Sequence, residues 1–403
     1  MRVGRVPGGP GLPGRLLTSL MVLGSAAWLV VAFGWFRGVG RVRVLREVAR
    51  NLDPVDRYPS VSVVVAARDE EAGIGEALRS VLDQDYPGPL EVLAVDDRST
   101  DRTGQIIAGL AAERPGRLRP LRVDRLPEGW LGKNHALYRG AGKAGGEWLL
   151  FTDADVTFAP DCIKDAIHYA TSENFDHLTL SPALISRGVA LKSFVAAFVL
   201  IFEVTQRPWL APDPGTKEAV GVGSFNLLRR EAYFMAGTHA AIRLRPDDDM
   251  RLARLLKESG YSQGVAYGTG SLSVEWHTNL AGAVRGLEKS IFPGIGYRLS
   301  MVLLAALLLS STNIAPFAGI LLARRPALRL LFAADVFAVV AMYAYGPRVS
   351  GSAVSPLYAA LHPFGTGVFV YAMLRSACVT LARGGIEWRG TFYPLRNLRG
   401  GTP

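Results

Sequence analysis

The hydrophobic pattern divides the chain into an apolar N-terminal run, a central region of short alternating segments and an apolar C-terminal region. Residues 16–36 carry no charged side chain and reach the roughly 20 residues that span a bilayer, which predicts an uncleaved membrane anchor. Residues 1–15 are rich in Gly, Pro and Arg and are expected to be disordered. A cleaved signal peptide is the alternative, but its apolar part would be too long and no convincing small-residue cleavage site follows.

The central region, residues 59–279, alternates between strand-type and helix-type patterns. Apolar and β-branched runs predict strands at 61–67, 90–95, 118–123, 148–152 and 178–184. The intervals between them predict helices at 74–82, 103–111, 133–144 and 161–170. Strands that alternate with helices of this length imply a largely parallel sheet with right-handed crossovers. Residues 220–228 are expected to be extended, and helices are expected at 230–235 and 246–257.

The last part of the chain is again apolar. Residues 280–298 are basic and partly amphipathic, which predicts a helix at the membrane interface. The region 299–378 contains three candidate membrane spans, at 299–323, 328–345 and 356–377. Residues 379–403 form a basic tail. A further apolar stretch, 191–204, is too short to span and is expected to be either an interfacial helix or a core element.

The distribution of charge indicates a membrane as partner and predicts on which side of it the central domain lies. The 403 residues are 49% hydrophobic and carry a net charge of +10, and the arginines lie beside the apolar runs, which favours a membrane over nucleic acid. The basic juxtamembrane segment 37–58 has more arginines than the segment before the anchor. The positive-inside rule therefore predicts a multi-pass cell-membrane protein with a cytoplasmic central domain. An anchor plus three spans would place the basic tail outside, and a re-entrant or doubled C-terminal segment would resolve this conflict.

The two cysteines add little. Cys162 and Cys378 lie far apart and form neither a metal-binding pattern nor a disulfide framework. A reducing, cytoplasmic compartment fits the central domain.

Acidic residues recur where predicted strands end. They are Asp69 and Glu70, Asp96 and Asp97, and Asp153 and Asp155. The carboxyl ends of parallel strands lie along one edge of a sheet, where α/β proteins bind ligands. Buried carboxylates need a partner, and Mg²⁺ takes one or two carboxylates together with water and substrate phosphates. The alternative for Asp153-Ala154-Asp155 is a solvated turn at a strand end.

Several motifs follow one another along this region. They are VSVVV from Val61 with RDEE from Arg68, VDDRSTDRT from Val95, GWLGKNHAL from Gly129, FTDAD from Phe151 and DDMRLAR from Asp248. Together they resemble the family 2 glycosyltransferases over roughly residues 59–290. With the flanking apolar segments, the chain looks most similar to the group that glycosylates lipids such as hopanoids, carotenoids or ceramide.

The resemblance implies a GT-A fold, which is α/β and Rossmann-like, flanked by transmembrane helices. It implies inverting transfer of one sugar from a nucleotide-sugar, a UDP-hexose or UDP-N-acetylhexosamine, to a membrane lipid or isoprenoid. Nucleotide-binding residues would be Ala67, Asp69, Glu70, Asp97, Lys133, Asp153 and Ala154. Asp97 would accept a hydrogen bond from uracil, and Asp69 or Glu70 would lie near the base and ribose.

The resemblance also assigns a metal and a base. Asp153 and Asp155 would hold a divalent cation, Mg²⁺ or Mn²⁺, that bridges the diphosphate and offsets the charge on the leaving UDP. Asp249 would take the proton of the acceptor hydroxyl. The motif reads Asp-Asp where relatives commonly have Glu-Asp, so Asp248 stays open as the base, and capping of the helix is the structural alternative for either residue.

Other features bear on the activity. The Gln/Arg-x-x-Arg-Trp signature of processive polysaccharide synthases is absent, and Arg285 and Lys289, which lie in about that region, do not reproduce it. This favours single-sugar transfer over the two alternatives, a polysaccharide synthase and an inactive nucleotide-binding scaffold. Of the histidines near the motifs, only His239 is a candidate for contact with acceptor or phosphate.

Overall fold

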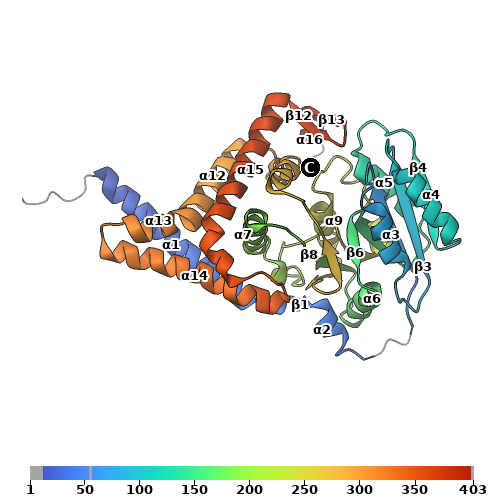
Figure 1. Cartoon of the computed structure of the whole chain (residues 1–403), viewed down its shortest axis with the longest axis horizontal. Coiled ribbons are helices and arrows are strands. Elements are labelled where there is room, and N and C mark those ends of the chain that lie inside the picture. The colour runs from blue at the N-terminus through green and yellow to red at the C-terminus, as the bar shows by residue number, and fades with distance from the viewer. Residues whose placement is uncertain (1–11, 54–56, 401–403) are drawn as a thin grey trace, which may run out of the picture.

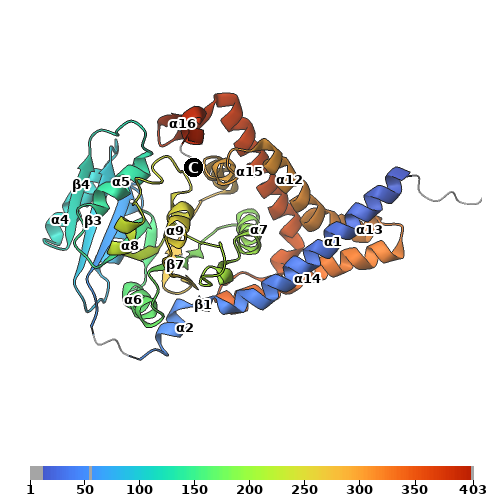
Figure 2. The same ribbon diagram turned by 180° about the vertical axis from the view of Figure 1, so that it is seen from behind.

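An α/β domain lies beside a group of long helices in the computed structural model, which describes residues 12–53 and 57–400 (Figures 1 and 2). The domain is built on an eight-stranded sheet. In spatial order its strands are β1 (Arg43–Val44), β10 (Gln263–Tyr267), β7 (His177–Ser181), β9 (Asn226–Arg229), β5 (Trp148–Asp153), β2 (Val61–Ala67), β3 (Leu90–Asp97) and β4 (Leu118–Val123). All neighbouring strands are parallel except at β9, which is antiparallel to both β5 and β7. The expected α/β class with a mostly parallel sheet is confirmed.

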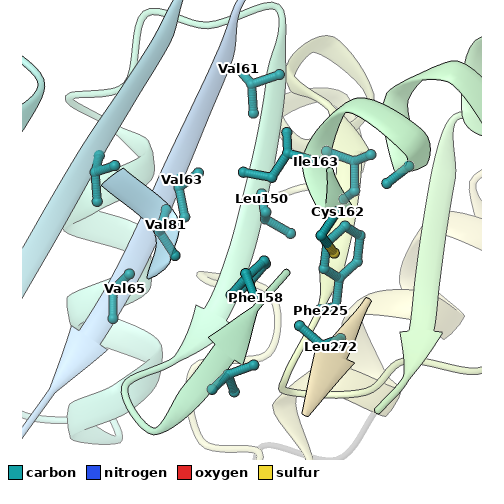
Figure 3. Close-up of a cluster of buried hydrophobic side chains, with 14 of the residues drawn as sticks. Val61, Val63, Val65, Val81, Leu150, Phe158, Cys162, Ile163, Phe225 and Leu272 are labelled. Atoms are coloured by element: carbon teal, nitrogen blue, oxygen red, sulfur yellow. The ribbon is translucent and has the colours of Figure 1, made fainter. Parts of the chain in front are cut away.

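Helices cover both faces of this sheet. One face carries α3 (Ile74–Leu82), α4 (Thr103–Glu113) and α6 (Cys162–Ser172), and the other carries α5 (Gly132–Ala141), α8 (Arg230–Met235) and α9 (Asp248–Glu258). A small sheet of β6 (Val156–Phe158), β11 (Leu272–Val274) and β8 (Ala183–Leu184) lies next to the first group. Figure 3 shows Val61, Val63 and Val65 of β2 and Leu150 of β5 in one buried cluster with Val81 of α3, Phe225, and Cys162 and Ile163 of α6. Burial of apolar strand faces on both sides explains why the strands read as continuous apolar runs.

The long helices coincide with the apolar segments of the chain. They are α1 (Leu12–Gly38), α7 (Val189–Gln206), α12 (Leu299–Leu309) continued by a π-helical turn η3 (Ser310–Ile314) and α13 (Ala315–Leu322), α14 (Pro326–Ser350), and α15 (His362–Arg383), which follows the turn η4 (Pro356–Leu361). Five helical stretches of the described chain are long and apolar enough to cross a membrane: Met21–Arg41, Val189–Leu210, Leu299–Leu322, Pro326–Ser350 and Pro356–Arg383.

A buried polar contact joins these helices to the sheet. The carboxylate of Glu203 in α7 accepts hydrogen bonds from Trp35 Nε1 of α1 at 2.9 Å and from the Tyr267 hydroxyl of β10 at 2.8 Å. Two directional bonds on one buried side chain fix the first long helix relative to the edge of the α/β domain.

The remaining elements are short. They are η1 (Val39–Arg41), α2 (Leu45–Ala49), η2 (Pro208–Leu210), α10 (Leu280–Glu288), α11 (Ile291–Gly294), β12 (Gly385–Trp388), β13 (Thr391–Pro394) and α16 (Leu395–Gly400). The last three differ from the expected basic tail, because the segment after α15 forms a β-hairpin and a helical turn. Their apolar side chains pack on Leu131, Phe292 and Met373.

Several boundaries also differ from the sequence expectations. The expected strand 178–184 is broken at Pro182, which has no N–H to donate. The stretch 191–204 is too short to span by itself, but its helix extends to 189–206 and, with η2, reaches spanning length. Helix α1 begins at Leu12, inside the segment expected to be disordered, while the rest of that segment, residues 1–11, lies outside the described residues.

The expected extended segment 220–228 is the clearest difference, since only Asn226–Arg229 forms a strand. The preceding residues form a loop whose N–H groups bond to side chains. Gly223 N donates to Asp249 Oδ2 at 2.9 Å, and Val222 N donates to Thr179 Oγ1 at 3.1 Å. These bonds replace the strand pairing that the apolar pattern suggests.

The buried position of Leu150 gives a stability prediction. Leu150 lies in the middle of β5 and is 0% exposed, whereas Met235 on α8 is 73% exposed. We expect Leu150→Ala to lower the free energy of unfolding by about 2–5 kcal/mol, because it removes buried methyl groups and leaves a cavity. Met235→Ala should change it by less than about 0.5 kcal/mol. Denaturant unfolding of the detergent-solubilised protein measures both, and equal effects would contradict the assignment of β5 to the core.

Candidate active site

Three acidic segments meet at one edge of the sheet. In the register of the parallel strands, Ala67 of β2 lies opposite Asp96 of β3, and Ala66 lies opposite Asp153 of β5. The carboxyl ends of β2, β3 and β5 are therefore adjacent, as predicted from the sequence. Ala67 and Ala154 are buried within this edge.

The part of this edge beside β3 is strongly paired. Both carboxylate oxygens of Asp97 accept hydrogen bonds from Arg98, at 2.8 Å from Nε and 3.1 Å from Nη2. Asp96 Oδ2 accepts a bond from Arg122 Nη1 at 2.9 Å. Asp69 has a positive φ of 52° and its Oδ1 accepts a bond from Thr100 N at 2.7 Å. These contacts order the loops that follow β2 and β3.

Lys133 joins the acidic end of β5 to the acidic start of α9. Its Nζ lies 2.7 Å from Asp153 Oδ1 and 3.4 Å from Asp248 Oδ2. Although burial alone would lower the pKa of Lys133, the charges of Asp153, Asp248 and Asp249 raise it above its ordinary value. Burial opposes ionisation of Asp153, but Lys133 nevertheless holds the pKa of that carboxyl below its usual range. Lys133 is therefore a fixed positive charge between the end of β5 and the start of α9.

Asp249 occupies a different environment from its neighbour Asp248. Its two carboxylate oxygens accept main-chain hydrogen bonds from Gly223 N at 2.9 Å and Met250 N at 2.7 Å. No lysine, arginine or histidine nitrogen in the described chain lies within 4.0 Å of it. Burial, and then the charge of Asp248, raises the pKa of Asp249 to about 7. Burial also raises the pKa of Asp248, even though Lys133 opposes the shift.

A small cavity opens among these groups. Lys133, Asp248 and Asp249 line it together with Leu137, Phe151, Thr152, Gly223, Asn226, His239 and Leu252. His239 Nδ1 is hydrogen-bonded to the Tyr233 hydroxyl at 2.8 Å, and burial lowers the pKa of His239 to about 3. His239 is thus a neutral wall of the cavity, and its Phe151 and Tyr233 ring contacts explain its position.

Two glycines allow the close approach of these segments. A Cβ at Gly223 would lie 2.7 Å from Asp153 Oδ2 and 3.3 Å from Lys133 Nζ. A Cβ at Gly132 would lie 2.3 Å from Asp97 Oδ2. In the first turn of α5, Gly132 therefore lies against Asp97, and the next residue, Lys133, pairs with Asp153. Asp97, Asp153 and Asp249 therefore surround one site.

The carboxylates at the end of β5 fit a divalent cation. Partial desolvation, and then the charges of Asp153 and Glu70, raises the pKa of Asp155 to about 6, and a cation would relieve this repulsion. Nowhere in residues 12–53 and 57–400 do three or more His, Cys, Asp or Glu side chains form a ready-made metal site. Two carboxylates suffice for Mg²⁺ when a phosphate ligand completes its coordination.

Sequence reasoning missed several residues of this region. Gly223 lay in a segment read as strand, so its contact with Asp153 was not expected. Arg98 carried no role, although it follows Asp97 directly. Lys289 and Arg389 were assigned to an interfacial helix and a tail, and no local pattern marks their approach to β5 and β2.

The sequence of this chain is similar to those of known proteins. Residues 62–234 match the family described as Glycosyl transferase family 2. The 4,4'-diaponeurosporenoate glycosyltransferase of Staphylococcus aureus (strain USA300) is 26% identical over 355 residues, which cover 84% of this chain and 89% of that protein.

Two solved structures are also similar. A mannosyltransferase from Pyrobaculum calidifontis, in complex with GDP-Man and Mn²⁺, has a TM-score of 0.48 at 19% identity and covers 89% of this chain and 98% of its own. A fragment of TarS from S. aureus, in complex with UDP, has a TM-score of 0.36 at 18% identity and covers 82% and 93%.

The contacts of Lys133 predict a pH-dependent loss of stability. Because the folded-state pKa values of Asp248 and Asp249 are raised, stability from these groups is lost as the pH rises through those values. Lys133→Met removes their counter-charge and should lower the free energy of unfolding by about 3–5 kcal/mol at pH 8. The loss should be smaller at pH 5, which lies below the raised pKa of Asp249, so that this carboxyl is protonated and no longer needs a counter-charge. Unfolding curves at both pH values measure the difference.

Lys143→Met is the matched control, because Lys143 is exposed and forms no ion pair among the described residues. It should leave stability unchanged at both pH values. An equal loss for Lys133→Met at pH 5 and pH 8 would show that its ammonium does not compensate the carboxylates.

Proposed function

The chain is a glycosyltransferase with a family 2 catalytic domain, and we propose that it transfers one sugar, with inversion, from a UDP-sugar to a lipid-like membrane acceptor. The observation that carries this proposal is the convergence of Lys133, Asp248 and Asp249 around one cavity at the carboxyl edge of the sheet, with Asp153 paired to Lys133. Together with Asp155, this arrangement combines a fixed positive charge, a pair of carboxylates that we propose to hold a cation, and a carboxylate with a raised pKa. A nucleoside diphosphate and a reacting hydroxyl require these three features.

The nucleoside is proposed to bind beside β3. Asp97 would accept a hydrogen bond from the uracil ring, and Asp69 and Glu70 would lie near the base and ribose. The Arg98 pairing holds the Asp97 carboxylate in place, and each of its oxygens keeps a second lone pair for the ligand. The main chain at Ala67 and Ala154 would complete this part of the site.

The diphosphate is proposed to lie over the first turn of α5 and the end of β5. Lys133 would neutralise part of its charge, since it is already held as a cation beside Asp153. A divalent cation held by Asp153 and Asp155 would supply further stabilisation of the departing diphosphate. The chain's own contribution is to place these groups before the donor arrives, so that little reorganisation accompanies the reaction.

Asp249 is proposed as the general base. It takes the proton of the acceptor hydroxyl while that oxygen bonds to the anomeric carbon, and the bond from this carbon to the diphosphate oxygen breaks on the opposite face. Its pKa of about 7 suits proton transfer near neutral pH. Asp248 is proposed instead to orient Lys133, because it lies 3.4 Å from that ammonium.

The acceptor is proposed to be an apolar molecule with a hydroxyl or carboxyl group. The S. aureus relative is named for a diaponeurosporenoate acceptor, and the five apolar helices of this chain would bring a membrane-dissolved molecule to the catalytic domain. We propose a cell-membrane protein whose catalytic domain faces the cytoplasm, as the arginines after α1 favour.

The pH dependence of transfer tests the base. For the wild-type enzyme, we expect kcat/KM to rise as the pH increases through about 7, because Asp249 must lose its proton to act. Asp249→Asn should lower kcat by about 10²–10⁴-fold and leave UDP binding intact. Asp248→Asn should keep a rise with pH at a reduced rate, but shifted to lower pH, because the charge of Asp248 helps to raise the pKa of Asp249. A normal pH profile in Asp249→Asn together with its loss in Asp248→Asn would reverse the two roles.

Metal dependence tests the donor chemistry and the function together. Purified protein with a lipid extract, UDP-glucose or UDP-N-acetylglucosamine and Mg²⁺ or Mn²⁺ should yield a lipid heavier by one sugar, detected by mass spectrometry. EDTA should abolish most of this product because it removes the cation. Asp155→Ala should do the same because it removes one of the two carboxylate ligands. The exposed Asp213→Ala serves as control. Polymer formation would favour a polysaccharide synthase, and unchanged turnover of Asp155→Ala would remove the metal role.

A further inference from the structure

The C-terminal hairpin reaches the carboxyl edge of the sheet (Figure 1). Strands β12 and β13 are joined by Arg389 and Gly390, both with positive φ, at 50° and 69°. This is the backbone of a tight two-residue hairpin turn. The turn projects Arg389 beyond the paired strands, and its Nη1 donates to the carbonyl oxygen of Arg68 at 2.9 Å. Its other guanidinium nitrogen pairs with Glu70.

Further contacts hold the hairpin against the site. Arg68 Nη1 donates to Thr391 Oγ1 at 3.3 Å, and Gly132 N donates to the Tyr393 hydroxyl at 3.3 Å. Gly132 is the first residue of α5 and precedes Lys133. The hairpin thus contacts both the loop after β2 and the helix start that is proposed to receive the diphosphate.

The same hairpin holds a second cation. Lys289, at the end of α10, lies with its Nζ 4.3 Å from the centre of the Trp388 ring. No carboxylate of the described chain lies within 4.0 Å of this ammonium. Burial lowers the pKa of Lys289 to about 8, with a smaller effect from the positive charge of Lys133, while Asp153 and Asp248 oppose the shift.

Lys289 therefore forms no direct ion pair among the described residues, and the positive charge of Lys133 acts against its ionisation. An aromatic face replaces only part of the hydration that an ammonium loses, and an unpaired charge in a desolvated position is costly. The proteins that retain such a group commonly use it at a ligand site. A dianionic group placed among Lys133, Lys289 and Arg389 would supply the missing counter-charge.

We propose that Lys289 and Arg389 bind the diphosphate of the donor and stabilise it as it leaves. This proposal rests on the proposed function and adds two residues to it, one of them supplied by the C-terminal hairpin. When the bond between the anomeric carbon and the diphosphate oxygen breaks, the electron pair stays on that oxygen, and both side chains remain protonated. Arg389 exchanges part of its contact with Glu70 for a phosphate oxygen.

A comparison of UDP and UMP binding tests this assignment. We expect Lys289→Met and Arg389→Ala each to weaken UDP binding by about tenfold, the effect of one lost charged hydrogen bond. UMP, which lacks the β-phosphate, should bind the variants and the wild type equally. Arg389→Lys should recover part of the UDP affinity. Arg396→Ala is the matched control. Arg396 on α16 is exposed, and its substitution removes the same charge from the same C-terminal segment.

The outcomes separate this inference from the proposed function. Calorimetry on the full-length protein in detergent gives both affinities, and the melting temperature of each variant shows whether it is folded. If the variants bind UDP as tightly as the wild type, or lose UDP and UMP affinity equally, the two residues do not bind the diphosphate, while the function stands. If the wild type binds UDP but transfers no sugar from a UDP-sugar, the proposed function fails although the diphosphate contact holds. If the wild type binds neither nucleotide, both proposals fail.

Discussion

The site depends on two ion pairs that Lys133 forms, one with Asp153 and one with Asp248. One ammonium joins the end of β5, through Asp153, to the start of α9, through Asp248. Buried ion pairs of this kind stabilise a fold weakly, because desolvation offsets much of their attraction, but removing one partner leaves an uncompensated charge. Lys133 therefore makes the two segments interdependent. The absence of a side chain at Gly223 is part of the same constraint, since any Cβ would enter this contact.

The antiparallel strand β9 explains how the sheet serves this contact. It lies between β5 and β7, and the loop that leads into it passes Gly223 beneath the Asp249 carboxylate. If the strand beside β5 were parallel to it, the segment leading into that strand would lie at the other edge of the sheet, away from Asp249. The reversal thus places main-chain N–H groups, rather than another strand end, against the second acidic motif.

The sequence predicted best those features that depend on local pattern. The strands β2 and β4 and the helices α3 and α8 have the expected bounds, since each is an uninterrupted run between clear boundaries. The meeting of Asp69, Asp97 and Asp153 followed from parallel topology alone. Arg389 could not be predicted, because its partner Glu70 is 319 residues away and no repeating pattern links them. The hydrogen bond between Trp35 and Glu203 could not be predicted either, because it joins two apolar segments that no sequence pattern links.

The position of the hairpin also bears on the conflict in the charge pattern. In the membrane arrangement that we propose, the C-terminal segment lies on the side of the catalytic domain, because Arg389 and Tyr393 contact its residues. Three complete crossings between domain and hairpin would place it on the opposite side. Helix α15 is the one that we expect not to cross. It packs closely along α7, as a Cβ at Gly365 would lie 2.5 Å from the Ser193 carbonyl oxygen. One outward passage through α12 and α13 and one return through α14 then keep the arginines of the C-terminal segment on the cytoplasmic side, as the positive-inside rule requires.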